Sequence, residues 1–210
     1  MIPEKYFSVN GIVLKCSDFS ESSRILTLFS DEYGLIKVSA KAVKRKDSKL
    51  LPVTQPLSFG RYQLCRGKND LHTLTSGELI ENFYGISKDI DRFTAAGEMT
   101  GELLKNLVPE EPEPDVLRLY LNSLFTLCYS EKEISFVRPV FTLRLKYELG
   151  FLADPEAVIK KYVPDANKVT ADVLEHIFNS DLKQLYGFTV SDDIKRTIGI
   201  LAEMVRSEDK

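Results

Sequence analysis

Apolar residues in the first 80 positions form short runs separated by polar turns, a pattern that is typical of β-strands. Five segments carry this pattern and are rich in β-branched and apolar residues: residues 8–16, 24–30, 35–42, 57–65 and 71–79. Two of the gaps between them, residues 31–34 and 66–70, contain glycine and have the length of hairpin loops. Five short strands in about 80 residues favour a small closed barrel over an open sheet. An SH3-like barrel would give a similar pattern, so the pattern alone leaves the type of barrel open.

Beyond residue 90 the apolar residues recur every three or four positions, which is typical of amphipathic helices. This spacing predicts three helices, at residues 93–107, 116–128 and 136–149. Pro109 must lie beyond the end of the first helix, and Pro114 suits the start of the second. Gly150 suits the position just after the third helix, where a left-handed backbone is common.

Capping residues predict three shorter helices near the C-terminus. Asp154 and Pro155 have the residue types of an N-cap and of a first helical position. Thr170 and Ser191 are expected to cap two further helices. The boundary between the strand-rich and the helical part falls near residues 80–90.

The remaining composition narrows the classes of protein. Cys16, Cys65 and Cys128 are too widely spaced for a disulfide framework or a zinc site, and His72 and His176 belong to no metal or catalytic motif. Phosphate-binding glycine loops and nucleophile motifs are absent, so the sequence gives no sign of an enzyme or of a cofactor. It also lacks an apolar run of about 18 residues and a secretory signal pattern, so we expect a soluble, intracellular protein that is not associated with a membrane.

Charge is distributed unevenly along the 210 residues. Basic residues outnumber acidic ones by 13 to 9 over residues 1–88, whereas acidic residues outnumber basic ones by 22 to 15 over residues 89–210. Between positions 37 and 49 there is one acidic residue and six basic ones: Lys37, Lys41, Lys44, Arg45, Lys46 and Lys49. Such asymmetry suggests a part that binds a polyanion joined to an acidic part.

A nucleic-acid backbone is a dense line of negative charge, and each phosphate that a basic side chain neutralises releases a counterion. Lys37 and Lys41 are expected on one face of a strand, and the loop that follows would extend this basic patch. Bases could also stack on aromatic rings of the barrel, although each of the four candidates could equally belong to the core: Phe19, Tyr33, Phe59 and Tyr62. The alternative is that the basic stretch is only a solvated loop.

Residues 11–50, GIVLKCSDFSESSRILTLFSDEYGLIKVSAKAVKRKDSKL, resemble the opening of the RecO recombination-mediator family. The resemblance lies in an apolar strand ending in lysine, a serine-rich turn with Glu21, the strand RILTLFS, an E-x-G-L-I turn and a basic loop. Later segments fit the family in the same order, and the resemblance therefore covers nearly the whole chain: residues 57–83, 91–124 and 141–156.

The resemblance implies an α+β fold, with a five-stranded OB-type β-barrel in residues 1–82 as the nucleic-acid-binding domain and an α-helical domain in residues 83–210. It also implies a non-enzymatic role in DNA repair and DNA recombination after DNA damage. Family members bind single- and double-stranded DNA, anneal complementary strands, associate with RecR and help RecA displace single-strand-binding protein. A cytoplasmic, nucleoid-associated location would follow.

The family also suggests which residues act. Those in matching segments are the expected phosphate contacts: Arg24, Lys37, Lys41, Lys44, Arg45, Lys46 and Lys49. Charge and hairpin position add Arg61, Arg66 and Lys68. The family docks the acidic C-terminal tail of single-strand-binding protein on its helical domain, and we expect an apolar pocket rimmed with cations for it. The expected residues of this pocket lie on one helix: Arg138, Phe141, Arg144 and Lys146.

One departure from the family pattern concerns metal. Many RecO proteins carry a four-cysteine zinc site after the third helix, but residues 160–173 here, KKYVPDANKVTADV, contain no cysteine, so we expect no metal. A competing hypothesis is an adaptor protein whose basic loop meets an acidic protein partner without nucleic acid. An enzyme is disfavoured, because no acidic residues of the barrel have a spacing that would pair them.

Overall fold

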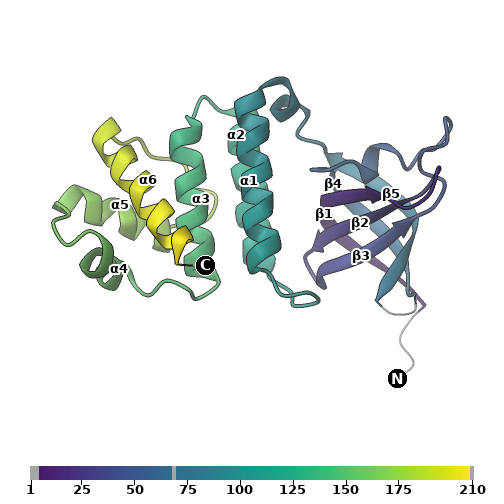
Figure 1. The fold of residues 1–210 in the computed structure, drawn as a ribbon, viewed down its shortest axis with the longest axis horizontal. Coiled ribbons are helices and arrows are strands. Elements are labelled where there is room, and N and C mark those ends of the chain that lie inside the picture. The colour runs from purple at the N-terminus through teal and green to yellow at the C-terminus, as the bar shows by residue number, and fades with distance from the viewer. Residues whose placement is uncertain (1–4, 68–69, 209–210) are drawn as a thin grey trace. The chain divides into compact units, whose positions relative to one another are not determined.

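The computed structural model describes residues 5–67 and 70–208 (Figure 1). The chain divides into two compact units, which are described separately: Met1–Phe83 with Leu103–Leu117, and Tyr84–Glu102 with Arg118–Lys210. In the described part of the chain, no helix combines the length and hydropathy required to cross a bilayer.

The first unit contains a five-stranded sheet that closes on itself. Its strands are β1 (Tyr6–Asp18), β2 (Arg24–Ser30), β3 (Gly34–Ala40), β4 (Phe59–Cys65) and β5 (Leu71–Glu81). They pair in the order β1-β2-β3-β5-β4, with β4 returning to β1, and all these pairings are antiparallel except that of β3 with β5. A closed five-stranded barrel of this kind is an OB-fold, so the predicted fold class is confirmed.

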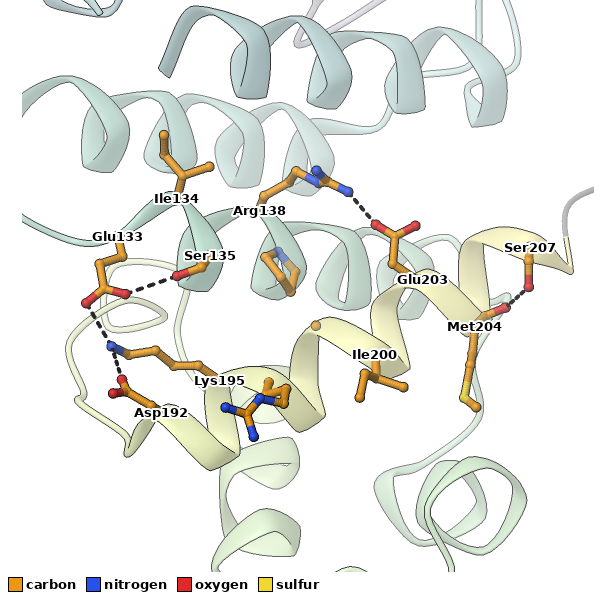
Figure 2. A pocket seen from close by; sticks show the side chains of 13 residues that line it. Glu133, Ile134, Ser135, Arg138, Asp192, Lys195, Ile200, Glu203, Met204 and Ser207 are labelled. Atoms are coloured by element: carbon orange, nitrogen blue, oxygen red, sulfur yellow. Dashed lines mark hydrogen bonds and ion pairs between the residues drawn. The ribbon is translucent and has the colours of Figure 1, made fainter. Parts of the chain in front are cut away.

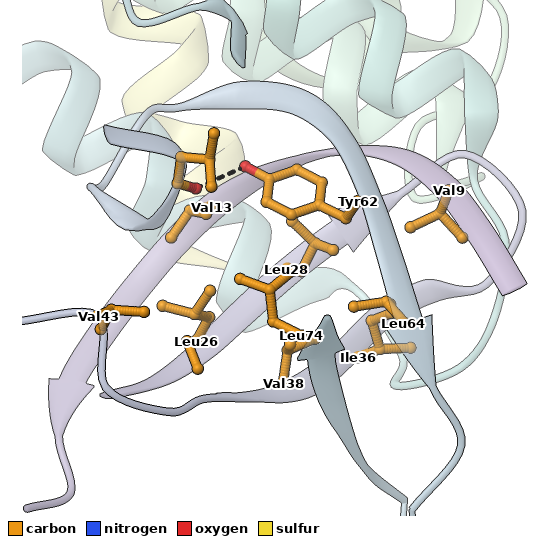
Figure 3. Close-up of a cluster of buried hydrophobic side chains, with 12 residues drawn as sticks. Val9, Val13, Leu26, Leu28, Ile36, Val38, Val43, Tyr62, Leu64 and Leu74 are labelled. Atoms are coloured by element: carbon orange, nitrogen blue, oxygen red, sulfur yellow. Dashed lines mark hydrogen bonds between the residues drawn. The ribbon is translucent and has the colours of Figure 1, made fainter. Parts of the chain in front are cut away.

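Side chains along each strand point alternately into and out of the barrel, and the inward ones form its core. Leu26 and Leu28 of β2 lie opposite Val38 and Ile36 of β3, and all four are almost completely buried (Figure 3). Tyr62 of β4 belongs to the same cluster, with its hydroxyl 2.9 Å from two backbone carbonyls. Burial also raises the pKa of Tyr62. Tyr62 is therefore a core residue and cannot be a stacking platform for a base.

Beyond the strands, the residues that the structure describes form six α-helices, and most of the helix termini agree with the capping signals. They are α1 (Ile90–Asn106), α2 (Pro114–Tyr129), α3 (Ile134–Glu148), α4 (Pro155–Tyr162), α5 (Lys168–Asn179) and α6 (Asp192–Ser207). Pro114 begins α2, Asp154 caps α4 through its side chain, and Gly150 follows α3 with a φ of +73°. The predicted N-cap of α5 was wrong, because Asn167 caps this helix and Thr170 is buried in its first turn.

In the second unit, a buried carboxylate joins three helices. Glu102 of α1 accepts a hydrogen bond of 2.8 Å from the hydroxyl of Thr142 on α3, and Arg206 of α6 lies 2.8 Å from its other oxygen. Burial raises the pKa of Glu102, and these two partners act in the opposite direction. Partners of this kind are what a buried carboxylate needs, since an unpaired one would be strongly destabilising.

Within the first unit, the segment after α1 packs against the turn between β2 and β3. Leu35 forms a β-bridge with Pro109 and accepts a backbone hydrogen bond of 3.2 Å from Glu110. Gly34 has a φ of +61°, and a Cβ at this position would lie only 2.0 Å from the backbone oxygen of Glu111. Glycine is therefore required at this turn for two separate reasons, its backbone conformation and its lack of a side chain.

This double requirement gives a stability prediction with a matched control. Gly34→Ala and Gly150→Ala both place alanine at a positive φ, but no atom lies within 4 Å of the Cβ position at Gly150. We expect Gly150→Ala to lower the free energy of unfolding by about 1–2 kcal/mol. Gly34→Ala should lower it by clearly more, as measured by urea denaturation. Equal losses would contradict the close approach of Glu111 to Gly34.

Candidate nucleic-acid interface

The basic loop is an ordered structure between β3 and β4. β3 ends at Ala40, because Ala42 adopts a φ of +56°, so Lys41 lies in the turn and not on the strand beside Lys37 as expected. Val43 and Val53 are buried in the barrel core and anchor the loop at two points. Successive backbone hydrogen bonds also fold residues 42–54 into turns. The cations between these anchors are therefore held outward on a defined backbone: Lys44, Arg45, Lys46 and Lys49.

A second loop, residues 19–23 between β1 and β2, lies against the start of the basic loop. The backbone N–H of Lys44 donates to the carbonyl of Ser22 at 3.2 Å, and that of Ala42 donates to the hydroxyl of Ser23 at 3.4 Å. We call the surface formed by these two loops the basic end of the barrel. Six of the predicted DNA-binding residues lie there: Arg24, Lys41, Lys44, Arg45, Lys46 and Lys49.

One carboxylate at the basic end is bracketed by two cations. Asp18 Oδ2 lies 2.6 Å from Lys44 Nζ, and Asp18 Oδ1 lies 3.4 Å from Arg24 Nε. The hydrogen bond from Lys44 holds the pKa of Asp18 below its ordinary value, and Arg24 acts in the same direction. Asp18 therefore stays ionised at neutral pH and occupies a position where a phosphate could meet both cations.

Arg24 differs from the loop lysines in its burial. It has the inward register of Leu26 and Leu28, because side chains two residues apart point to the same face of a strand. Only 18% of its side chain is exposed, and its Nε and Nη1 are buried without a hydrogen-bond acceptor in the described part of the chain. Arg24 thus closes the basic end and presents little surface of its own.

The other predicted DNA-binding residues lie elsewhere on the barrel. Arg66 lies at the opposite end, where its guanidinium stacks 4.6 Å from the ring of Phe7 and 5.5 Å from that of Tyr33. Arg61 lies in β4 and donates to the hydroxyl of Ser8. Lys68 lies outside the described residues.

Lys37 lies in the middle of β3, away from both ends of the barrel. Its ammonium group donates to the hydroxyl of Thr27 at 2.7 Å. It lines a cavity of about 580 Å³ together with Asp70 and Glu110, whose carboxylates would disfavour a phosphate. The sequence alone could not show that Arg61, Arg66 and Lys37 lie away from the basic end. The positions of residues along predicted strands do not reveal which end of a closed barrel they reach.

The four aromatic candidates also separate in the structure. Phe19, on the loop between β1 and β2, is 72% exposed. Tyr33 packs against Phe7, with 4.9 Å between ring centroids, and is covered by Arg66. Phe59 is half-buried, and Tyr62 is in the core. Phe19 is therefore the candidate whose ring is open to solvent.

The predicted pocket for an acidic tail on α3 is wrong, because most of its residues are interior. Phe141 is fully buried, and Lys146 and Arg144 are 1% and 7% exposed. Arg144 pairs with Glu148 at 2.6 Å and donates to the backbone carbonyls of Ile177 and Ser180 at the end of α5. Buried residues lie on several sides of α3, so these side chains are not on an exposed face.

Arg138 is the one member of this set that lines an open groove. The groove has a volume of about 850 Å³ and runs between α3 and α6 (Figure 2). Exposed Ile200 and Met204 form part of its apolar wall. Arg138 pairs with Glu98 and Glu203, and Lys195 is bracketed by two carboxylates at 2.9 and 3.0 Å. Since its cations already have acidic partners, the groove has no charge that would select an acidic peptide.

Residues 160–173, which contain no cysteine, form the end of α4, the connection 163–167 and the beginning of α5. Among the residues that the structure describes, His, Cys, Asp and Glu side chains nowhere gather in threes as a metal site requires.

The cluster around Arg66 gives a prediction that is independent of function. His72 is buried next to Phe7, and burial, assisted by Arg66, lowers the pKa of His72 below its ordinary value of 6.5. We expect Arg66→Gln to raise this pKa in an NMR titration, whereas Arg61→Gln should leave it in place. Because folding disfavours protonated His72, the protein should lose stability as the pH falls below about 6.5. An unchanged pKa in Arg66→Gln would contradict the contact.

Comparison with known proteins agrees with the resemblance seen in the sequence. A family model described as "Recombination protein O N terminal" matches residues 4–83, which include all five strands. A DNA repair protein RecO from Acetivibrio thermocellus is 27% identical over 97% of this chain and 91% of its own length. One from Caldicellulosiruptor bescii is 34% identical over 70% of this chain and 59% of its own length, and one from Clostridium novyi is 22% identical over 96% and 88%.

The family model covers the barrel that carries the basic end, and the alignments to the Acetivibrio and Clostridium proteins continue through the helices. The family match and the names of these relatives support a role in DNA repair. The chain belongs to the RecO family.

Proposed function

We propose that this protein binds DNA through the basic end of its barrel and acts as a recombination mediator. In this role it binds single- and double-stranded DNA, anneals complementary strands and, together with RecR, helps RecA load onto DNA coated with single-strand-binding protein. The observation that carries the proposal is the ordered loop that presents its cations at one end of an OB barrel. The loop between the first two strands, which also belongs to the basic end, is a common site of oligonucleotide binding in OB-folds.

Apart from Lys44, which is paired with Asp18, the cations of the basic loop are suited to phosphates because no carboxylate among the described residues neutralises them. In the described part of the chain, no ion pair to a carboxylate is recorded for Lys41, Arg45, Lys46 or Lys49. The backbone that carries these cations is already ordered by Val43 and Val53, so binding would cost less conformational entropy than it would for a free loop. Cations of this kind bind the phosphates of any nucleic acid, whatever its sequence, and the affinity falls as salt is added.

Charge neutralisation also explains how annealing could proceed without nucleotide hydrolysis. Two complementary strands repel each other through their phosphates, and a protein that covers part of this charge lowers the barrier to their approach. RecR, RecA and the tail of single-strand-binding protein remain partners proposed from the family. For the tail, the burial of Phe141 and Lys146 excludes the surface of α3 that we first expected.

The competing hypothesis is an adaptor whose basic end binds an acidic protein and no nucleic acid. Both hypotheses use the same cations, so loop charge alone cannot separate them. A gel-shift experiment with a single strand of random sequence at low salt distinguishes them, because an adaptor would not retard the DNA.

Removing three loop cations should weaken DNA binding and its dependence on salt. In the variant Lys44→Ala/Arg45→Ala/Lys46→Ala, up to three phosphate contacts are lost. For single-stranded DNA, the slope of log K against log salt concentration should therefore become shallower by up to about 2. Fluorescence anisotropy with a labelled oligonucleotide across a salt series measures both quantities.

The control for this experiment changes the net charge equally at another place. Lys160→Ala/Lys168→Ala/Lys183→Ala removes three exposed lysines from the second unit. This control should keep most of the affinity and the slope of the unchanged protein. An equal loss in the two triple variants would show that binding follows total charge, and the basic end would not be the site.

Asp18 gives a prediction of the opposite sign. The carboxylate of Asp18 pairs with Lys44 and Arg24. A phosphate that binds these two cations must either displace this carboxylate or bind beside its negative charge. We expect Asp18→Asn to bind DNA several-fold more tightly at low salt and to show a steeper salt dependence by about one contact. Asp47→Asn is the matched control: it removes the same charge from the basic loop, where no ion pair of Asp47 is recorded among the described residues. Weaker binding by Asp18→Asn would mean that Asp18 positions the two cations for DNA.

A further inference from the structure

Phe19 is the most exposed aromatic residue in the described part of the first unit, and it lies at the basic end. Its side chain is 72% exposed, and it follows Asp18 directly in the chain. Burying a phenylalanine ring is favourable, so a ligand that packs against Phe19 would gain free energy by removing this ring from solvent.

The loop that carries Phe19 is held in place by its own backbone. Phe19 and Ser20 both donate backbone hydrogen bonds to the carbonyl of Ser23, at 3.0 and 3.3 Å, and Ser23 donates back to Ser20 at 3.4 Å. Ser22 accepts the hydrogen bond from Lys44 that joins the two loops. The ring is therefore presented from a fixed backbone, which limits the entropy lost when a ligand packs against it.

The residue that precedes Phe19 in the chain is paired with two cations of the basic end. The Cα atoms of Phe19 and Asp18 are about 3.8 Å apart, as in any trans peptide. Asp18 in turn contacts Lys44 at 2.6 Å and Arg24 at 3.4 Å. An exposed aromatic ring and exposed cations thus belong to the same end of the barrel, and this combination suits a nucleotide whose base is unpaired.

We propose that Phe19 stacks on an unpaired base and makes the basic end selective for single-stranded DNA. The proposal rests on the proposed function, because it assigns strand preference to the same site. In a duplex both faces of each base are already stacked on neighbouring bases, so Phe19 gains little there. In a single strand the base is free, and such stacking tolerates any sequence.

The alternative platform lies at the opposite end of the barrel. Tyr6 is 56% exposed there, and the ammonium group of Lys5 lies 5.6 Å from its ring centroid. Tyr33 at that end is already covered by Arg66, at 5.5 Å. Tyr6 therefore serves as the matched aromatic control for Phe19.

The experiment compares Phe19→Leu and Tyr6→Leu in binding to an oligothymidylate of about 16 nucleotides and to a duplex of equal length. Leucine keeps the apolar volume but removes the aromatic face. Phe19→Leu should weaken binding of the single strand roughly 5- to 150-fold, the range measured for loss of one stacked base, and change duplex binding less than about twofold. Tyr6→Leu should leave both affinities nearly unchanged.

A direct signal is available because the chain contains no tryptophan. Phe19→Trp introduces a single indole, whose fluorescence should be quenched on addition of the oligothymidylate and not on addition of the duplex. Thermal unfolding followed by circular dichroism shows whether each variant is folded.

The outcomes separate this proposal from the proposed function. If Phe19→Leu changes neither affinity while the triple variant of the basic loop loses DNA binding, the basic end binds phosphates only and the stacking proposal is overturned. Equal losses for the single strand and the duplex would overturn the strand preference. A selective loss in Tyr6→Leu would place stacking at the opposite end. If the triple variant binds normally, the proposed site itself fails.

Discussion

The burial of Val43 and Val53 in the barrel core determines where the positive charge of this protein lies. These two residues anchor a loop that, without them, would be a mobile run of lysine and arginine. With both ends of the loop fixed, the cations between them remain exposed on a defined backbone, and the loop between β1 and β2 can pack against it through Lys44 and Ser22. An apolar interaction inside the barrel is thus the condition for an electrostatic surface outside it.

The positive charge that the basic end offers to DNA is smaller than a count of its lysines and arginines suggests. Arg24 is mostly buried at the end of the barrel, and a buried guanidinium requires a nearby counter-charge. Asp18 supplies this charge and contacts Lys44 as well. The same carboxylate that allows Arg24 to lie there therefore reduces the charge that Arg24 and Lys44 offer to DNA. Affinity and stability are linked through one exposed side chain.

The sequence predicted the elements of this fold well and the positions of single side chains less well. Strands and helices follow from the period of apolar residues, and Pro114, Asp154 and Gly150 mark their ends, because these signals are local. Phe19 and Tyr62 look alike in sequence, yet one is 72% exposed and the other is completely buried. Tyr62 points from β4 into the barrel, whereas Phe19 lies on the loop after β1, and the closure that encloses Tyr62 depends on pairing between strands far apart in the chain.

Counting charges by halves of the chain is informative only once the partners of each charge are known. In the second unit, Arg144 is buried against Glu148 and backbone carbonyls, and Arg138 and Lys195 are paired with carboxylates. These cations stabilise contacts within and between helices and are not available to a polyanion. On the basic loop, Arg45 and Lys46 are exposed, and no carboxylate partner is recorded for them in the described part of the chain. Exposed lysines such as Lys160 and Lys183 also occur in the second unit, but the cations of the basic loop are close together in the chain and lie on an ordered backbone, which supports the proposal that DNA binds to the barrel.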